Sequence, residues 1–385
     1  MRLVVTGGGT GGHIYPALAV AEMVQGMTPA NDANGNTVTY VGKIDGLESE
    51  LVPQNGVAFE GIRFYGMPRG KSPLLPFQLL AWGWKLREAR AHARTILQRL
   101  QPDVVFGTGG YVSAPVLMAA HSLNIPYVVH EPDAKPGLVN QLMSRNAAII
   151  TTSFSEGAES LGHRPEQQVL VTGNPIRGRI GALSKAEALR QLGIDWPSEQ
   201  PVLLVTGGSQ GARRINQAIV EALPTLLNDF GFAVAHLTGK KRYDETVAAL
   251  KQSHPAIQNH PHYWLRPYSG EMAALLAIAD LAVCRAGSLS LSEMAVCGVP
   301  TLLIPYPFAA ADHQHKNAQA CVRVGASLML EDDECTGDNL LATLRPLMHE
   351  PQRLARMRDA ARQQGHPNAT EDIVACLMGL SQAKG

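Results

Sequence analysis

The sequence predicts a protein of the α/β class, with two doubly wound domains and a cleft between them. Short runs rich in Val, Ile and Leu alternate with longer amphipathic stretches along most of the chain. Near-continuous apolar strands separated by helices are typical of parallel sheets that helices cover on both faces. The pattern pauses near residue 175 and then restarts, and 385 residues are enough for two domains. We therefore expect domains at 1–174 and 175–366.

The first half of the chain contains six strand candidates. They are "RLVVTGG", "TVTYVG", "DVVFGTGG", "PYVVHE", "AAIITTS" and "QVLVTGN". Amphipathic stretches at 16–25 and 78–100 lie between them and predict helices. The stretch 173–179, within "TGNPIRGRIGALSK", interrupts the alternation and is the predicted linker.

The second half repeats the alternation. Its strand candidates are "PVLLVTGG", "FAVAHLTG", "HYWLRPY", "LAVCRAG" and "TLLIPY". The segment 367–385 contains "NATEDIVACLMGLSQ", which predicts a last helix that packs back on the first domain.

The composition excludes several classes of protein. The net charge is zero, which gives no global electrostatic support for a nucleic-acid partner. The five cysteines form no C-x-x-C pair, so we expect neither disulfides nor a zinc site. No apolar run reaches the length of a membrane span of about 18 residues. Because Met1-Arg2 leads directly into a predicted strand, we expect no signal peptide.

Glycine turns follow three of the predicted strands. Gly7, Gly9 and Gly12 fit the pattern G-x-G-x-x-G, and similar turns recur in "TGGSQGARRIN" and "GTGGYVSAP". Such turns let backbone N–H groups and a helix N-terminus approach an anion, although glycines also simply permit tight turns. Ligands of open α/β sheets lie beyond the carboxyl ends of the strands. Each domain is therefore predicted to be Rossmann-like, with its ligand at the cleft.

The first glycine turn does not predict a dinucleotide site. NAD-binding domains carry an acidic residue about 20 residues further on, where it holds the ribose hydroxyls. Here the second strand ends in Val41-Gly42-Lys43, without a carboxylate. An NAD-dependent oxidoreductase is therefore disfavoured.

Several stretches together resemble one family over nearly the whole chain. They are "GGTGGH", "GGYVSAP", "HEPDAKPGLVN", "GNPIR", "GGSQGARRIN", "CRAGSLSLSE" and "DHQHKNA". In order and approximate spacing they resemble the MurG family, the UDP-N-acetylglucosamine–N-acetylmuramyl-(pentapeptide) pyrophosphoryl-undecaprenol N-acetylglucosamine transferases. The resemblance implies a GT-B glycosyltransferase fold and inverting transfer of GlcNAc from UDP-GlcNAc to lipid I, giving lipid II for peptidoglycan. It also implies a peripheral protein on the cytoplasmic face of the bacterial inner membrane, with no metal or other cofactor.

In the first domain the resemblance implies catalytic roles for His13 and Glu131. His13 is the candidate general base, and a contact to an acceptor phosphate is its equal alternative. Asp133 stands where the family generally has Asn, and an ionised carboxylate accepts but does not donate hydrogen bonds. His130 and Glu131 could instead hold their own loop, and Tyr111 could pack within its loop. The implied substrate-binding residues of this domain are Thr10, Gly11, Gly12, Tyr111, His130 and Asp133.

In the second domain the resemblance implies a site for the donor. Glu293, one or two turns into a predicted helix, would accept hydrogen bonds from the ribose hydroxyls. Gln314 matches the position that reads GlcNAc hydroxyls, and Ser269 replaces a commonly aliphatic residue beside the uracil. Capped helices or a solvated surface are the alternatives for these residues. The implied set is Arg177, Ser209, Gln210, Ser269, Arg285, Ser288, Leu289, Ser290, Glu293, His313 and Gln314.

The region 63–99 has the composition of a surface that contacts an anionic membrane. It carries eight basic residues and one acidic residue, Glu88, around a run of leucines and tryptophans. Apolar groups flanked by cations suit a membrane surface, whereas a core helix with a basic outer face is the ordinary alternative.

Other functions remain open for this set of motifs. A transferase that glycosylates diacylglycerol and a UDP-GlcNAc 2-epimerase are the alternatives with related chemistry. A non-catalytic nucleotide-sugar binder is a third, and a variant of His13 that binds the donor without turnover would exclude it.

Overall fold

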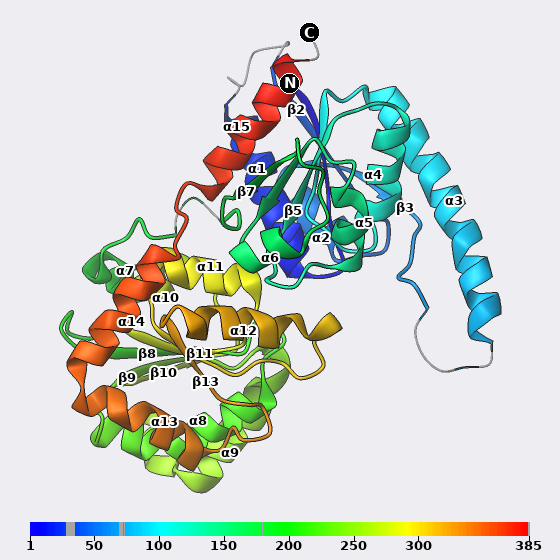
Figure 1. Cartoon of the computed structure of the whole chain (residues 1–385). Helices are drawn as coiled ribbons and strands as arrows, with labels where there is room; N and C mark the ends of the chain where they lie inside the picture. The colour runs from blue at the N-terminus through cyan, green and yellow to red at the C-terminus, as the bar shows by residue number, and fades with distance from the viewer. Residues whose placement is uncertain (28–34, 69–71, 73, 177, 179, 384–385) are drawn as a thin grey trace. The chain divides into compact units, whose positions relative to one another are not determined.

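The chain forms two compact units in a computed structural model that describes residues 1–27, 35–68, 72, 74–176, 178 and 180–383 (Figure 1). One unit comprises Met1–Ile176 together with Asn368–Gly385, and the other comprises Arg177–Pro367. The chain passes from the first unit to the second two residues after the expected position 174. It returns to the first unit at Asn368, one residue after the expected position 367.

Parallel strands form the sheet of the first unit. Within the described residues its order is β3-β2-β1-β4-β5-β6-β7, and every neighbouring pair is parallel. The strands are β1 (Arg2–Thr6), β2 (Thr37–Lys43), β3 (Ala58–Ile62), β4 (Val104–Gly107), β5 (Tyr127–Glu131), β6 (Ile149–Thr152) and β7 (Gln168–Val171). The six predicted strands are present. The seventh, β3, was not predicted, because "AFEGI" lies at the sheet edge, and Glu60 and Gly61 interrupt its apolar pattern.

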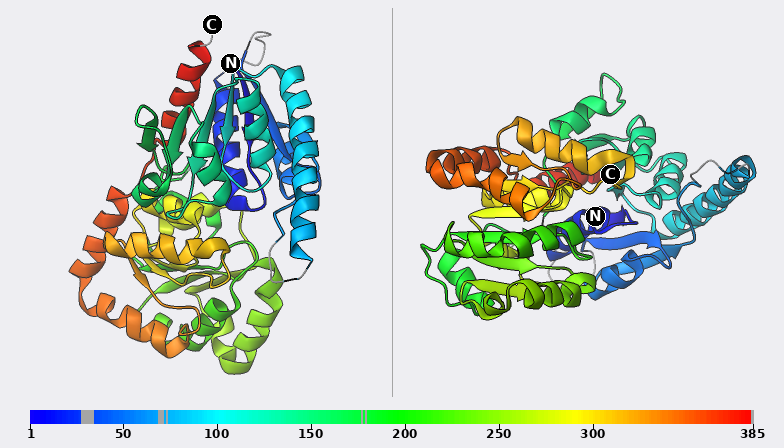
Figure 2. Two further views of the ribbon diagram at one scale, coloured as in Figure 1. Left: turned by 45° about the vertical axis from the view of Figure 1, so that its right-hand side comes forward. Right: turned by 90° about the horizontal axis from the view of Figure 1, so that it is seen from below.

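Helices cover this sheet and include the end of the chain. They are α1 (Gly11–Gly26), α2 (Glu48–Gln54), α3 (Leu75–Leu100), α4 (Ser113–Ser122), α5 (Leu138–Ser144), α6 (Ser155–Ser160) and α15 (Ala369–Gln382). Helix α15 runs beside α1 (Figures 1 and 2). Ile373, Val374 and Leu377 are buried in the same apolar cluster as Ala17 and Val24 of α1. The last helix therefore completes the core of the first unit.

Helix α3 is buried along only part of its length. Its buried residues, Ala89, Ala93, Ile96 and Leu97, all belong to the C-terminal half. The N-terminal half projects away from the rest of the first unit (Figures 1 and 2). Among the described residues, no helix combines the length and the apolar content needed to cross a bilayer.

The second unit repeats the parallel architecture. In the described part of this unit the strand order is β10-β9-β8-β11-β12-β13. The strands are β8 (Val202–Thr206), β9 (Ala233–Leu237), β10 (Tyr263–Arg266), β11 (Leu281–Cys284), β12 (Thr301–Leu303) and β13 (Ser327–Met329). Strand β13 was not predicted, because three residues are too few to give a periodic signal. The five predicted strands are present.

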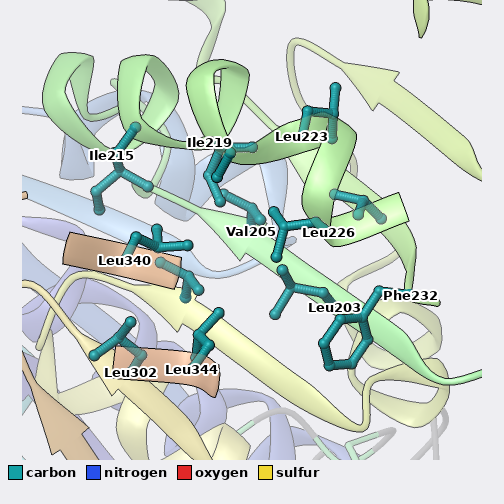
Figure 3. Packing of buried hydrophobic residues seen from close by; sticks show 14 of the residues in the cluster. Leu203, Val205, Ile215, Ile219, Leu223, Leu226, Phe232, Leu302, Leu340 and Leu344 are labelled. Atoms are coloured by element: carbon teal, nitrogen blue, oxygen red, sulfur yellow. The ribbon is translucent and has the colours of Figure 1, made fainter. Parts of the chain in front are cut away.

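The helices of the second unit pack on this sheet. They are α7 (Lys185–Leu192), α8 (Arg213–Asn228), α9 (Tyr243–Ser253), α10 (Met272–Ile278), α11 (Ser288–Cys297), α12 (His313–Arg323), α13 (Gly337–His349) and α14 (Pro351–Gln363), with short 3-10 turns at Lys240–Arg242, Pro255–Asn259 and Ala310–Asp312. Helix α8 buries Ile215, Ile219 and Leu223 against β8, and α13 adds Leu340 and Leu344 to the same cluster (Figure 3). The spacing of these residues by four positions places each set on one helix face.

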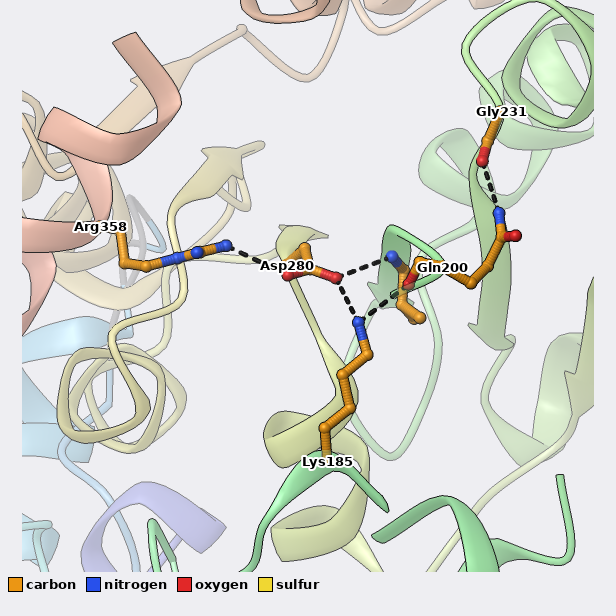
Figure 4. Close-up of polar contacts among 6 residues, drawn as sticks. Lys185, Gln200, Gly231, Asp280 and Arg358 are labelled. Atoms are coloured by element: carbon orange, nitrogen blue, oxygen red, sulfur yellow. Dashed lines mark hydrogen bonds and ion pairs between the residues drawn. The ribbon is translucent and has the colours of Figure 1, made fainter. Parts of the chain in front are cut away.

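Asp280 ties three elements together at the amino end of β11. Its carboxylate contacts Lys185 of α7 at 2.7 Å and Arg358 of α14 at 3.1 Å, and it accepts a hydrogen bond from the Val202 backbone at 3.0 Å (Figure 4). One partly buried carboxylate therefore links two helices to the start of β8.

Replacing Asp280 by Asn should lower the free energy of unfolding by about 1–3 kcal/mol, because two cations lose their shared carboxylate. Asp359, in an exposed pair with Arg362 at 4.0 Å, is the matched control. Its Asn variant should change stability by less than about 0.5 kcal/mol. Urea denaturation of both variants measures the difference, and equal losses would contradict the assigned role of Asp280.

Candidate functional site

Each sheet has one position where its strand order reverses. In the first unit this position lies between β1 and β4, and in the second between β8 and β11. Ligands of doubly wound folds bind beyond the carboxyl ends of the strands at this switch point. The loops that begin there are 7–10 and 108–112 in the first unit and 207–212 and 285–287 in the second. The three glycine turns expected from the sequence all lie in these loops.

The two loops of the first unit pack backbone against backbone. Gly110 has φ +78°, and a Cβ added to it would lie 2.2 Å from the Gly8 carbonyl oxygen. A Cβ on Gly7 would lie 2.1 Å from Thr108 Oγ1. Glycine is therefore required for the packing itself, so the structural explanation holds for these positions. Thr10, the N-cap residue of α1, is exposed and makes no capping hydrogen bond with its side chain.

His13 lies in the first turn of α1, partly exposed beside both loops. Its Nδ1 lies 2.9 Å from the Thr108 carbonyl oxygen. Because a carbonyl only accepts hydrogen bonds, the neutral imidazole carries its proton on Nδ1 and its lone pair on Nε2. Gly109 packs against the ring, since a Cβ there would be 3.2 Å from His13 Cε1. The ring is thus held in the tautomer that a general base requires.

Glu131 is buried and organises the loop that follows β5. Its Oε1 accepts a hydrogen bond from the Asp133 backbone at 3.0 Å. Its Oε2 accepts from the Gly137 backbone at 3.0 Å and from the Asn140 side chain at 2.9 Å. Burial raises the pKa of Glu131 to about 8, and these hydrogen bonds oppose the rise. With 1% of its surface exposed, the carboxylate acts on its own loop.

His130 is fully buried beneath the same loop. Its Nε2 donates to Asn174 Oδ1 at 3.2 Å, and the Thr151 hydroxyl lies 3.0 Å from Nδ1. Burial lowers the pKa of His130 to about 4, an effect that the hydrogen bond to Asn174 partly offsets. Both ring nitrogens therefore have protein partners, and the neutral form is favoured.

Acid should destabilise the protein through His130. The unfolded chain takes up this proton near the ordinary pKa of 6.5, whereas the folded chain takes it up near 4. The contribution of neutral His130 to the free energy of unfolding is therefore fully present above pH 6.5. It is lost as the pH falls toward 4, and the loss amounts to roughly 3 kcal/mol. Urea denaturation between pH 7 and 4 should show a shallower pH dependence for His130→Gln than for the wild type. Equal slopes would contradict the assignment.

Tyr111 and Asp133 occupy different depths of the first site. Tyr111 is partly exposed in the 108–112 loop, its ring centroid 6.2 Å from that of Phe64, and burial raises its pKa. Asp133 is 7% exposed. Gly11 and Gly12 are the first two residues of α1 and are partly exposed. The structure thus gathers Thr10, Gly11, Gly12, His13 and Tyr111 around one pair of loops.

Glu48 is a residue of this site that the sequence did not predict. Its side chain is buried, and its Oε1 accepts a hydrogen bond from the Lys43 backbone at 3.0 Å. A Cβ on Gly8 would lie 2.4 Å from the same oxygen, which places the carboxylate directly behind the first glycine turn. In the sequence it belongs to a polar stretch, "GLESELVPQ", that gives no sign of burial.

The glycine loop of the second unit packs against the end of β9. Gly211 has φ +78°, and a Cβ there would lie 2.0 Å from the Thr238 carbonyl oxygen. Asn216 of α8 donates to this carbonyl at 3.0 Å and accepts from His236 at 3.1 Å. Burial lowers the pKa of His236 to about 3. Ser209 and Gln210 are exposed in the same loop.

Helix α11 begins directly after loop 285–287. Ser288 is its first residue, and Glu293, its sixth residue, is 8% exposed. Leu289 and Ser290 are partly exposed. The Oγ of Ser269, after β10, accepts a hydrogen bond from the Glu271 backbone at 3.0 Å. Arg177 lies outside the described residues.

Arg285 is held within the second unit. Its Nη1 donates to the carbonyls of Ile304 and Pro305 at 3.0 and 3.1 Å and lies 2.6 Å from Asp332 Oδ1. The backbone of Tyr306 in turn donates to Gln314 Oε1 at 3.0 Å. The guanidinium therefore holds the segment that leads to Gln314.

The turn before α12 has an unusual backbone. Ala311 and Asp312 have φ +52° and +61°, a region that residues other than glycine rarely adopt, and such strain is concentrated at functional sites. His313, the first residue of α12, and Gln314 are partly exposed. In the part of the chain that the structure describes, no three His, Cys, Asp or Glu side chains gather as metal ligands.

Comparison with known proteins agrees with this architecture. Residues 3–152 match the glycosyltransferase family 28 N-terminal domain, and residues 202–373 match the glycosyltransferase family 28 C-terminal domain. A UDP-N-acetylglucosamine--N-acetylmuramyl-(pentapeptide) pyrophosphoryl-undecaprenol N-acetylglucosamine transferase of Desulforudis audaxviator is 40% identical over 99% of both chains. The protein of the same name from Halothermothrix orenii is 38% identical over 97% of both chains.

Solved structures extend the comparison to the fold. The crystal structure of Acinetobacter baumannii MurG matches with a TM-score of 0.75 and 27% identity, over 98% of this chain and 99% of that one. A UDP-GlcNAc 2-epimerase from Neisseria meningitidis, bound to UDP-GlcNAc, matches with a TM-score of 0.65 and 15% identity, over 98% and 100% of the chains. The second likeness shows the fold alone. With two parallel-sheet domains of the GT-B type and relatives that match it over nearly its full length, the chain belongs to the MurG family of glycosyltransferases.

Proposed function

We infer that this chain transfers GlcNAc from UDP-GlcNAc to lipid I, undecaprenyl-pyrophosphoryl-MurNAc-pentapeptide, and so forms lipid II for peptidoglycan. The observation that carries this inference is the match to transferases of that name over 99% of the chain at 40% identity. The glycine loops at both switch points support it, because each presents backbone N–H groups where an anionic ligand binds.

The first unit binds the acceptor in this proposal. The N-terminus of α1, with Thr10, Gly11 and Gly12, contacts the acceptor diphosphate. His13 Nε2 takes the proton from the acceptor hydroxyl as its oxygen bonds to the anomeric carbon and the bond to UDP breaks. Attack opposite the leaving group inverts that carbon. The hydrogen bond from Nδ1 to the Thr108 carbonyl supports this role, because it leaves the lone pair on Nε2.

His130 and Glu131 act as positioning residues in this proposal. Both are buried, and Glu131 accepts two hydrogen bonds from the loop after β5 and one from Asn140 of α5. The loop after β5 carries Asp133, and the loop 108–112 carries Tyr111. Each of these two side chains would contact the acceptor or the transferred sugar. The alternative expected from the sequence, a pair that holds its own loop, is thus the better supported of the two.

The second unit binds the donor. Glu293 accepts hydrogen bonds from the ribose hydroxyls, and the loop with Ser209 and Gln210 contacts the diphosphate. Ser269 lies toward the uracil, Ser288, Leu289 and Ser290 line the nucleotide, and His313 and Gln314 contact the sugar. Arg177 adds a nucleotide contact. Backbone N–H groups and arginine stabilise the negative charge that develops on departing UDP, so the reaction should proceed with EDTA present.

Helix α3 docks on the membrane that carries the acceptor. Phe77, Leu80 and Trp84 are 71%, 67% and 64% exposed. Trp82 differs from Trp84, because it packs against Phe64 and donates to the Tyr65 carbonyl at 3.0 Å. Apolar side chains on an exposed helix with basic neighbours favour an anionic leaflet. The protein is thus peripheral on the cytoplasmic face of the inner membrane, with the region 63–99 as its contact; Arg69 and Lys71 of this region lie outside the described residues.

Removing the apolar groups of α3 should release the protein from vesicles. The triple variant Phe77→Ser, Leu80→Ser, Trp84→Ser should bind vesicles containing phosphatidylglycerol at least about tenfold more weakly. Each large apolar side chain that the bilayer buries contributes roughly 1.5–3 kcal/mol to binding. The variant's turnover of a water-soluble acceptor analogue should be unchanged. Sedimentation with vesicles measures the difference, and undiminished binding would place the membrane contact elsewhere.

Product analysis tests the proposed function. The enzyme is incubated with UDP-GlcNAc and EDTA, and with a lipid I analogue, diacylglycerol or no acceptor. We expect the lipid I analogue alone to gain one N-acetylhexosamine, seen by mass spectrometry, with a β-linkage seen by NMR. Glycosylated diacylglycerol, or conversion of the donor to its 2-epimer without acceptor, would overturn the assignment in favour of the corresponding alternative.

A further inference from the structure

Asp332 contacts two arginines at the carboxyl edge of the second sheet. It follows β13, and its side chain is 16% exposed. One carboxylate oxygen lies 2.6 Å from Arg285 Nη1, and the other lies 3.3 Å from Arg214 Nε. A single carboxylate therefore serves two guanidinium groups, one on each of its oxygens.

The two arginines belong to the two loops of the switch point. Arg214 is the second residue of α8, directly after the glycine loop 207–212. Arg285 directly follows β11 and begins the loop that leads to α11. Asp332 thus connects both loops that the donor would contact, although it lies in neither.

The contacts continue from Arg285 to Gln314. Arg285 Nη1 donates to the carbonyls of Ile304 and Pro305, and the next backbone N–H, that of Tyr306, donates to Gln314 Oε1. The Arg285 guanidinium also lies over the Tyr306 ring, 5.5 Å from its centroid. Asp332 therefore supports the segment 304–314 through one arginine.

A neighbouring contact joins the same turn to α12. Glu331 Oε1 lies 3.3 Å from His315 Nδ1, one residue after Gln314. The turn after β13 thus reaches the start of segment 304–314 through Arg285 and contacts the residue that follows its end.

We propose that Asp332 is a positioning residue for donor recognition, which orients Arg285 and through it the segment 304–314 so that Gln314 can read the sugar of the donor. The proposal rests on the proposed donor site of the second unit. The charge of Asp332 matters because Arg285 has only 14% of its side chain exposed, and a charge that poorly solvated depends on its partner. The uridine and the diphosphate are assigned to residues other than Gln314, and the contact of Asp332 with Arg214 is longer and more exposed than that with Arg285. The effect of Asp332 should therefore fall mainly on the sugar.

The test compares Asp332→Asn with Asp333→Asn, a matched change at the next, exposed position. Calorimetric titration gives the dissociation constants of UDP-GlcNAc and of UDP, which lacks the sugar. We expect Asp332→Asn to weaken UDP-GlcNAc binding about tenfold, which corresponds to 1.4 kcal/mol, and to change UDP binding by less than about twofold. Asp333→Asn should match the wild type, and Asp332→Glu should recover part of the loss.

Two results would overturn the proposal. If Asp332→Asn binds both ligands like the wild type, the carboxylate positions nothing. If it loses affinity equally for both ligands, Asp332 has a general structural role. If Asp332→Asn does not fold, Arg214→Gln breaks the bridge at its exposed end and should show a smaller loss of the same selectivity; no loss contradicts the proposal. A wild type that binds neither ligand would instead overturn the donor site itself.

Discussion

Replacing His13 by Gln is expected to lower kcat by a factor of about 10² to 10⁴, the usual contribution of a general base. Glutamine can still donate a hydrogen bond to the Thr108 carbonyl, which His13 Nδ1 contacts at 2.9 Å, but it cannot take up a proton. Binding of UDP-GlcNAc should be unchanged, because we assign the donor to the second unit. Steady-state kinetics with a water-soluble lipid I analogue measure the loss.

The pH profile separates the two roles left open for His13. If it is the base, the acidic limb of kcat/KM in the wild type reports its deprotonation and should disappear from the residual activity of His13→Gln. If it only contacts phosphate, KM for the acceptor should rise while kcat and the acidic limb remain. His121→Gln, at an exposed histidine in the last turn of α4, is the control and should behave as the wild type. Normal turnover by His13→Gln would exclude the base.

Replacing Gly211 by Ala should lower the free energy of unfolding by about 3–5 kcal/mol and remove measurable binding of UDP-GlcNAc. The backbone at φ +78° costs an L residue about 1–2 kcal/mol. The added Cβ would also lie 2.0 Å from the Thr238 carbonyl oxygen, and backbone atoms cannot move aside as a flexible side chain can. The 207–212 loop must therefore shift, and with it the N–H groups that we assign to the diphosphate.

Gly208 of the same loop provides the control. It has φ +79°, and a Cβ there would meet no atom within 4 Å. Gly208→Ala should therefore show only the backbone cost of about 1–2 kcal/mol. Thermal unfolding and calorimetric titration of both variants distinguish the effect of the contact with the Thr238 carbonyl from the effect of the backbone conformation. Equal effects of the two substitutions would contradict the close packing described for Gly211.

The fold could be predicted because its signals are local. Buried parallel strands are apolar throughout, and a glycine turn after a strand is visible within ten residues, as in "LVVTGGGTGG". Strands β3 and β13 were not predicted, because they lack such a local signal. The first contains Glu60 and Gly61, and the second has three residues, so neither produces a clear period.

The depth of the site residues could not be predicted in the same way. His130 and Glu131 lie in a recognisable motif, but the motif does not reveal their burial. His130 has its hydrogen-bond partners, Thr151 and Asn174, on later parts of the chain. Glu131 has its partners where the chain folds back after β5, up to the start of α5. Glu48 and Asp332 have polar neighbours and no motif. Only tertiary structure brings Glu48 behind Gly8 and Asp332 against Arg285.

In the proposed mechanism the second unit binds the donor, and Glu293 holds its ribose. Calorimetric titration of UDP-GlcNAc into Glu293→Gln measures the contribution of this carboxylate to donor binding, with Glu199→Gln, at an exposed glutamate, and His13→Gln as controls. Loss of a charged acceptor of hydrogen bonds costs about 1.5–3 kcal/mol, so binding should weaken about 10- to 100-fold in Glu293→Gln. Both controls should bind like the wild type. If Glu293→Gln binds UDP-GlcNAc like the wild type, or if His13→Gln loses affinity for it, the donor site does not lie where we assign it.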